Sequence, residues 1–176
     1  MSNLQARMRG KVWKFGDSVD TNQLAGGGIE ASSDPDENLK ANCLRILRPE
    51  FPMQVKQGDI LVTGTNFGCG SSRQTAVQAL QLCGIQAVLA ESVARIHKRN
   101  SIAMALPTFI VPGITQLAAD GDELEVDYPA GVVRNLTSGR ELPLTRFPHT
   151  VEQIYELGGI CQVIADKLAG QGVLPN

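Results

Sequence analysis

Residues 60–73 read ILVTGTNFGCGSSR. A short apolar run breaks into glycines, and two serines and an arginine follow where a helix is predicted to begin. Backbone N–H groups freed by the glycines and by the unfinished first helical turn would converge here, and the helix dipole would add positive charge. This segment therefore predicts an anion site for a carboxylate, a phosphate or an oxyanion.

The chain around this segment alternates between short apolar strands and helices. The predicted elements are a strand over residues 60–64, a helix over 73–83, a strand over 85–90, a helix capped by Ser92 and running to about Met104, and a strand over 109–111. Strands that alternate with helices in this way imply a mainly parallel sheet covered by helices.

The two ends of the chain have a different pattern. We predict a first strand over residues 11–15, a long loop over 16–38, a strand over 123–128, a hairpin over 132–144 that turns at 137–139, helical spacing over 149–168 broken at Gly158-Gly159, and a frayed tail over 170–176. Loops as long as the first one are often lids or binding loops, and simple disorder is the alternative. Residues 1–176 are expected to form one α/β domain with antiparallel C-terminal strands.

Composition narrows the class of protein. The chain has 176 residues, of which 43% are hydrophobic, and this is enough for a compact core. Its formal net charge of −2 gives no basic field for nucleic acid or an anionic membrane. No apolar segment approaches the roughly 20 residues that span a bilayer, and no secretory signal is visible at the start. We expect a soluble protein in the cytoplasm.

The four cysteines give no metal site. Cys43, Cys69, Cys83 and Cys161 are widely spaced and form no C-x-x-C pair, so neither zinc nor iron–sulfur ligands are evident. Cys69 lies in the glycine-rich segment, where a helix start would stabilise a thiolate. A hydrolase that uses Cys69 as nucleophile is one hypothesis, but it needs a base, and nothing in the sequence brings a histidine close. A small packed side chain is the alternative.

The glycine-rich segment does not match three known motifs. Ser71-Ser72-Arg73 lacks the lysine of a P-loop, the third glycine of the dinucleotide fingerprint and the closing glycine of a nucleophile elbow. Arg73 could instead hold a carboxylate through two parallel hydrogen bonds. Ser71-x-x-Gln74 also reads as a helix capping box. The two interpretations are compatible, because donors that cap a serine oxygen also stabilise it after it loses its proton.

The second predicted helix carries a basic segment. Its polar residues are Arg95, His97, Lys98, Arg99 and Asn100. A solvated helix face is one interpretation of this cluster. The other is that its cations add positive potential at the glycine-rich segment or meet a partner protein.

Several motifs together resemble the small-subunit family of 3-isopropylmalate dehydratase, which is the swivelling domain of the aconitase superfamily. They are NFGCGSSR at residues 66–73, GIQAV at 84–88, SVARI at 92–96, GDSVDT at 16–21 and ELGG at 156–159. The similarity covers nearly the whole chain, and its central block is highly specific. It implies a β/β/α swivelling domain that docks on a separate large subunit, as a heterodimer or heterotetramer.

The resemblance also implies roles for residues of the site. The large subunit would carry a [4Fe-4S] cluster, and this chain would hold no cofactor of its own. Ser71 takes the position of the base that removes a proton next to a carboxylate, and Arg73 that of a substrate-carboxylate ligand. Gly70 and Ser72 would assist in binding the substrate, a small hydroxy dicarboxylic acid. The implied activity is that of a hydro-lyase acting on 3-isopropylmalate in leucine biosynthesis.

Two departures from the family pattern bear on the substrate. Gln74-Thr75 stands where the family usually has Glu-His, and Asn22 stands where an acid is common. Both changes alter local charge and leave room for a paralogue that acts on homoaconitate or a methylated malate. A non-catalytic module that binds a carboxylate and regulates another protein is the alternative from a different class.

Overall fold

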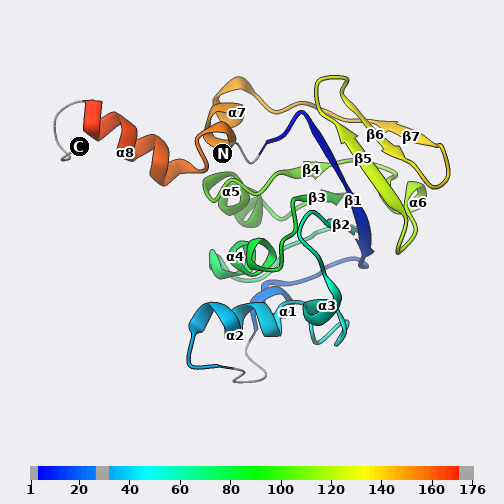
Figure 1. Ribbon diagram of the computed structural model, residues 1–176, viewed down its shortest axis with the longest axis horizontal. Coiled ribbons are helices and arrows are strands. Elements are labelled where there is room, and N and C mark those ends of the chain that lie inside the picture. Colours follow the sequence, from blue (N-terminus) through cyan, green and yellow to red (C-terminus); the bar gives the residue numbers. More distant parts are fainter. Residues whose placement is uncertain (1–3, 27–31, 171–176) are drawn as a thin grey trace.

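The computed structural model describes residues 4–26 and 32–170. In this part of the chain one sheet runs in the order β4-β3-β2-β1-β5-β6-β7 (Figure 1). The strands are β1 Arg7–Lys14, β2 Ile60–Thr63, β3 Ala87–Ala90, β4 Thr108–Ile110, β5 Glu123–Asp127, β6 Val132–Asn135 and β7 Glu141–Pro143.

Strand β1 joins the two halves of the sheet. It pairs in parallel with β2, with Val12 opposite Ile60, and antiparallel with β5, with Met8 opposite Val126. Strands β2, β3 and β4 continue the parallel half, and β5, β6 and β7 form an antiparallel meander. The predicted α/β fold, with parallel central strands and antiparallel C-terminal strands, is confirmed.

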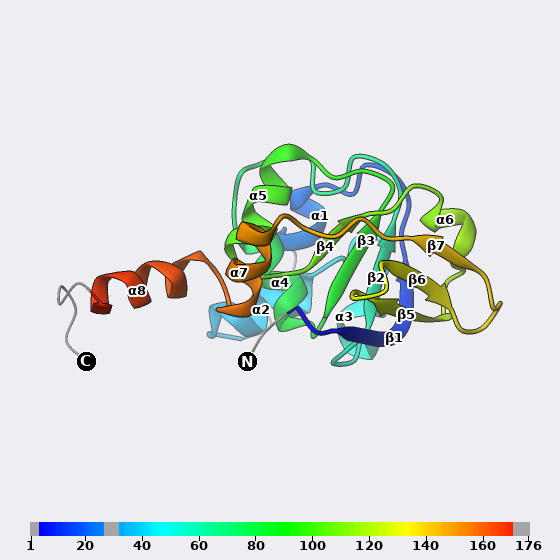
Figure 2. The same cartoon turned by 90° about the horizontal axis from the view of Figure 1, so that it is seen from above.

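The helices lie mainly around the parallel half. They are α1 Thr21–Ala25, α2 Pro35–Asn42, α3 Phe51–Gln54, α4 Thr75–Leu82, α5 Arg95–Ala103, α6 Ile114–Leu117, α7 His149–Glu156 and α8 Ile160–Gly170. Helix α8 projects away from the body of the molecule (Figures 1 and 2). No helix within residues 4–26 and 32–170 has the length and apolar character that crossing a membrane requires.

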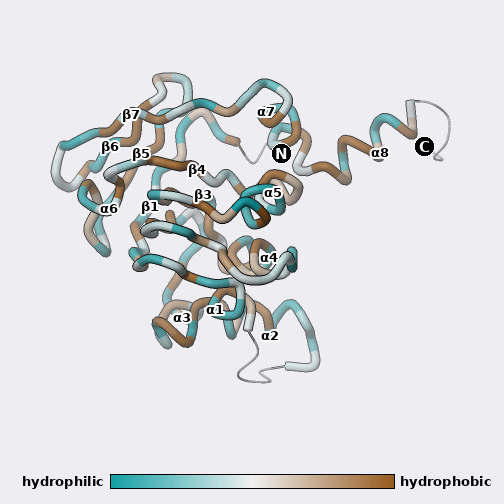
Figure 3. The backbone as a smooth tube through the Cα atoms, turned by 180° about the vertical axis from the view of Figure 1, so that it is seen from behind, coloured by the Kyte–Doolittle hydropathy of each residue, from teal (hydrophilic) through white to brown (hydrophobic). Residues whose placement is uncertain are grey.

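Two hydrophobic clusters lie on opposite faces of the parallel strands. Leu61 and Val88 point into the cluster that α1 and α4 cover, whereas Ile60 and Leu89 point into the cluster shared with α6 and β5. All of β2 and β3 is therefore buried, which explains why these strands are mostly apolar, as the hydropathy colours show for β3 (Figure 3).

The prediction of one long loop over residues 16–38 is wrong for the described parts of that segment. Helix α1 begins there after a capping box, in which the Asp20 carboxylate accepts from the Gln23 N–H and the Gln23 side chain accepts from the Asp20 N–H. Helix α2 follows an Asp34 cap. Helix α1 has only five residues, and α2 has few apolar side chains, so neither shows a sustained apolar period. Residues 27–31 lie outside the described residues.

Other predicted boundaries need smaller corrections. Strand β1 begins at Arg7 rather than at residue 11, because its first half pairs with β5. The hairpin β6–β7 and the helical C-terminal segment broken near Gly158-Gly159 are confirmed. The predicted frayed tail spans residues 170–176: Gly170 is the last residue of α8, and 171–176 fall outside the described residues.

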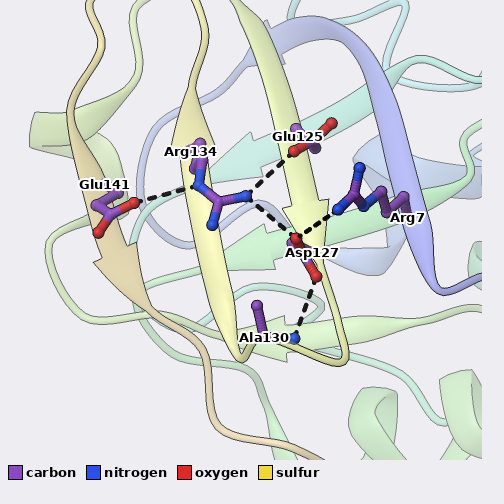
Figure 4. Close-up of polar contacts among 6 residues, drawn as sticks. All are labelled: Arg7, Glu125, Asp127, Ala130, Arg134 and Glu141. Carbon is purple, nitrogen blue, oxygen red and sulfur yellow. Dashed lines mark hydrogen bonds and ion pairs between the residues drawn. The ribbon is translucent and has the colours of Figure 1, made fainter.

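The charges of the antiparallel half are neutralised within the chain. Arg134 on β6 pairs with Glu125 and Asp127 on β5 and with Glu141 on β7 (Figure 4). Arg7 also lies on Asp127, 3.5 Å away. The hydrogen bond from the Ala130 N–H, with that from Arg134 and the charge of Arg7, lowers the pKa of the Asp127 carboxyl. These cross-strand pairs match the strand register, so this surface has structural partners for its cations.

Candidate active site

Three loops that follow β1, β2 and β3 meet at the carboxyl edge of the parallel strands, where open α/β sheets commonly bind ligands. The middle one, residues 64–74, carries the predicted site, and we call it the glycine loop. Isolated parallel bridges join Asp20 to Cys69 on one side and Phe67 to Val93 on the other. The glycine loop is thus held between its two neighbours.

Part of the glycine loop's hydrogen-bonding capacity is used inside the protein. The Thr65 N–H donates to Asp17 Oδ1 at 2.6 Å, and with the Thr65 hydroxyl this contact lowers the pKa of Asp17. The Asn66 N–H donates to Ser92 Oγ at 2.8 Å. The N–H groups of the glycine loop without an acceptor among the described residues are those of Cys69, Gly70, Ser72 and Gln74. The glycine loop therefore keeps several N–H groups that could donate to a bound anion.

Two predicted helix caps are wrong. Helix α5 begins at Arg95 without a side-chain cap, because the Ser92 hydroxyl accepts from Asn66 in the glycine loop instead. Helix α4 begins at Thr75, and the Gln74 side chain makes no capping bond. Ser71 therefore lies before the helix rather than at its tip, and the helix dipole contributes less there, because its effect fades within one turn.

Thr21 is the group that contacts Ser71. Thr21 Oγ1 accepts from the Ser71 N–H at 2.9 Å and donates to Ser71 Oγ at 3.1 Å. The side chain of Thr21 is buried, and its own N–H donates to the Cys69 carbonyl at 2.9 Å. The Arg73 N–H also points at Ser71 Oγ, at 3.5 Å. Donors aimed at this oxygen stabilise it as it becomes negative.

The other predicted site residues are open to solvent. Ser72 and Arg73 are exposed, and the Arg73 guanidinium has no hydrogen-bond or ion-pair partner among the described residues. The Ser72 carbonyl accepts from the Asn100 side chain at 2.9 Å, which ties the glycine loop to α5. Gly70 has a φ of +101°, and a Cβ there would lie 3.0 Å from Thr21 Oγ1. Gly70 thus allows the close approach of Thr21.

A pocket of about 550 Å³ opens on the α5 side of the glycine loop. Its lining includes Asn66, Gly68, Gly70, Arg95, Ile96 and Arg99. Neither Ser71 nor Arg73 is part of this lining. The pocket places two cations of the basic segment beside the glycine loop. Both are also exposed, so this face of α5 is solvated as the first interpretation of that segment expects.

His97, in contrast, supports the glycine loop from inside. It is only 1% exposed, and its ring packs edge-to-face on Phe67 with centroids 4.9 Å apart. Burial lowers the pKa of His97 to about 4, so the ring is neutral near pH 7. Cys69 Sγ donates to the Ser18 carbonyl at 3.6 Å rather than to a histidine. Among the described residues, the hypothesis of a Cys69 nucleophile therefore finds no base in contact with the thiol.

Gly68 offers a test of this packing. It has a φ of +73°, and a Cβ there would lie 2.1 Å from His97 Cγ. We expect Gly68→Ala to lower the free energy of unfolding by about 3 kcal/mol, measured by urea denaturation. Gly139 has a φ of +72° and nothing within 4 Å of its Cβ position, so Gly139→Ala should cost only about 1 kcal/mol. Equal losses would show that His97 does not constrain the glycine loop.

The described residues contain no group of three or more His, Cys, Asp or Glu side chains that could hold a metal ion. Cys43 and Cys83 are buried behind α4, Cys69 lies in the glycine loop, and Cys161 is exposed on α8. This set of donors does not fit an iron–sulfur cluster, which needs several thiolates around one site.

Known proteins resemble this chain over nearly its full length. A 3-isopropylmalate dehydratase small subunit from Aquifex aeolicus is 42% identical over 96% of this chain and 100% of that protein. The methanogen homoaconitase small subunit from Methanothermobacter thermautotrophicus is 43% identical over 89% of this chain and 90% of that protein. Both relatives are small subunits, which implies a large-subunit partner.

Structure comparison gives the same result. The crystal structure of 3-isopropylmalate dehydratase from Methanocaldococcus jannaschii matches with a TM-score of 0.85 and 34% identity, over 94% of this chain and 98% of that chain. The profile of the aconitase C-terminal domain matches residues 22–111, from α1 to just beyond β4. The chain is therefore a small subunit of an aconitase-family hydro-lyase and belongs to the family of 3-isopropylmalate dehydratase small subunits.

Proposed function

We propose that this subunit supplies the base and a carboxylate ligand for the dehydration and isomerisation of a hydroxy dicarboxylic acid. The contact between Thr21 and Ser71 is the observation that carries the proposal. A free serine hydroxyl is almost wholly protonated near neutral pH and needs donors to act as a base. Thr21 provides one such donor, and the Arg73 N–H provides a longer one.

Ser71 removes the proton from the carbon next to a substrate carboxylate. The exposed Arg73 side chain binds that carboxylate through its two-pronged guanidinium, for which it has no competing partner among the described residues. Ser72 and Gly70 assist with hydrogen bonds from their free N–H groups. Holding the carboxylate at Arg73 places the acidic C–H near Ser71, because only Ser72 separates the two residues.

The large subunit completes the site. We assign the [4Fe-4S] cluster to it, where the cluster would act as the Lewis acid for the departing hydroxyl. The active unit is a heterodimer or heterotetramer. We take residues 1–176 as one swivelling domain and place the enzyme in the cytoplasm. Sedimentation of the assembled complex would determine the stoichiometry.

The favoured substrate is 3-isopropylmalate, in equilibrium with 2-isopropylmalate, which would place the enzyme in leucine biosynthesis. The name of the Aquifex aeolicus relative supports it, whereas the homoaconitase relative supports homoaconitate as the alternative. The exposed pair Gln74-Thr75 follows Arg73 directly, so it is close enough to affect which diacid the enzyme prefers. An anaerobic assay of the assembled enzyme with isopropylmalate, homoaconitate and methylated malate would rank them by kcat/KM.

A non-catalytic regulatory module predicts a different behaviour. Such a module should bind a diacid tightly without a partner, because its pocket must be complete. An incomplete half-site exposes Arg73 to water and should bind the same acid weakly. Calorimetry of the isolated chain with 3-isopropylmalate separates the two, and submicromolar binding would favour the module.

Replacing Arg73 with lysine tests the carboxylate clamp. Lysine keeps the charge but cannot form two parallel hydrogen bonds with one carboxylate. We expect Arg73→Lys to raise KM about tenfold and to change kcat much less, measured by steady-state kinetics of the assembled enzyme. Arg45→Lys is the matched control, because Arg45 also lacks an ion pair but lies after α2, outside the candidate active site. A wild-type KM in Arg73→Lys would contradict the proposed binding of the carboxylate by Arg73.

A further inference from the structure

The arginines of this subunit divide into those whose guanidinium has a partner among the described residues and those whose guanidinium has none. Those that pair with a carboxylate among the described residues are Arg7, Arg9, Arg48, Arg134 and Arg146. Arg140 donates to the backbone carbonyls of Gln116 and Leu117. Those whose guanidinium has no such partner in the described part of the chain are Arg45, Arg73, Arg95 and Arg99. Three of these four flank the glycine loop, so uncompensated positive charge is concentrated there.

Arg95 and Arg99 line the same pocket. They are four residues apart on α5, so their side chains lie on one face of the helix. Both are exposed, and Ile96 between them is 46% exposed. Gly70, whose N–H has no acceptor among the described residues, also lines the pocket. Cys69, whose N–H likewise has no acceptor among the described residues, is also part of the lining. The pocket thus combines two cations, two N–H donors and an exposed apolar side chain.

The acids near the glycine loop are already engaged. Asp17 accepts from the backbone and hydroxyl of Thr65, and Asp20 caps α1. Glu91 accepts from the Gly113 N–H and from the backbone and hydroxyl of Thr115. No carboxylate among the described residues pairs with Arg95 or Arg99, so both guanidinium groups are open to an anion from another molecule.

We propose that the pocket receives an acidic side chain of the large subunit. The inference rests on the proposed function, because a partner that reaches Ser71 must also cover Gly70, which precedes Ser71 and lines the pocket. Covering the pocket takes two guanidinium groups out of water, which is unfavourable unless a carboxylate pairs with them. Arginine and exposed apolar side chains such as Ile96 are typical of the buried centre of protein interfaces.

The second carboxylate of the substrate is the competing occupant. Two features of the geometry disfavour it. Ser71 is bound by Thr21 of α1, whereas the pocket opens on the α5 side of the glycine loop. Arg73, the carboxylate ligand of the proposed function, does not line the pocket. Of the residues that line the pocket, only Gly70 belongs to the proposed substrate site, so the pocket borders that site and serves as a docking site.

The test is the dissociation constant between this subunit and its purified large subunit, with the cluster reconstituted anaerobically. Arg95→Ala and Arg99→Glu should each weaken binding at least tenfold, and both should reduce the salt dependence of binding. Arg45→Glu is the matched control and should leave the dissociation constant within twofold of wild type. All three side chains belong to surface helices or loops, and thermal unfolding checks that the variants are folded.

A wild-type dissociation constant in both Arg95→Ala and Arg99→Glu would overturn this inference. If KM were also raised in these variants, the pocket would be assigned to the substrate instead. Ser71→Ala separates the inference from the proposed function. It should bind the large subunit like wild type, and full activity in that variant would refute the proposed base without affecting the docking result.

Discussion

Ser71→Ala, assembled with the large subunit, is expected to lose about 10³-fold in kcat, because removing a general base costs roughly 10²- to 10⁴-fold. The change removes only one oxygen, from a side chain that is half-buried against Thr21. KM should change little, because Arg73 still holds the carboxylate. Steady-state kinetics at saturating large subunit measures both quantities.

Ser72→Ala is the control for Ser71→Ala. Ser72 is the next residue in the glycine loop, and its exposed hydroxyl makes no hydrogen bond among the described residues. We expect this variant to raise KM modestly and to keep most of kcat. Equal losses of kcat in the two variants would indicate a general disturbance of the glycine loop instead of a specific base at Ser71.

Thr21→Val is expected to lower kcat about 10²-fold, as the loss of one donor to a developing oxyanion does in other enzymes. Valine has nearly the shape of threonine but cannot donate to Ser71 Oγ or accept from the Ser71 N–H. In the proposed mechanism Thr21 does not contact the substrate and acts through Ser71. KM should therefore stay within about twofold of wild type.

Thr21→Ser is the conservative counterpart and should restore most of kcat, because it returns the hydroxyl. Thermal unfolding of Thr21→Val checks for a general loss of stability, which is a risk at a residue only 5% exposed. A wild-type kcat in a folded Thr21→Val protein would contradict the positioning role. So would a change confined to KM.

The sequence predicted the parallel half of the fold because its strands are completely buried. The apolar runs of β2 and β3 each end at glycine-rich or polar segments, which mark the boundaries. Helix α1 was missed because it has only five residues and begins with a local cap at Asp20. Short capped helices have no room for an apolar period, so the signal was the cap itself.

The candidate active site was only partly predictable. Ser71, Ser72 and Arg73 are adjacent in the sequence, so their chemistry could be inferred together. Thr21 is 50 positions before Ser71, and no local pattern connects them. They meet because β1 and β2 are parallel neighbours, which brings the loops after both strands to the same edge.

The sequence pattern places the start of α4 too early, at residue 73 instead of Thr75, for a physical reason. A serine followed three residues later by glutamine is a valid capping pattern, but the Ser71 hydroxyl contacts Thr21 instead. A tertiary contact thus replaced a local one. The position of Arg95 and Arg99 beside the glycine loop depended likewise on how α5 packs, which the basic segment alone did not determine.

Loss of the hydrogen from the substrate carbon separates proton removal from every other step. Substrate deuterated at the carbon next to the carboxylate would be mixed with excess assembled enzyme under anaerobic conditions, and the label at that carbon followed by NMR. The proposed base predicts that Ser71→Ala retains the label about 10³ times longer than wild type, with Thr21→Val between them. Loss of the label at the wild-type rate in Ser71→Ala would assign the base to another residue.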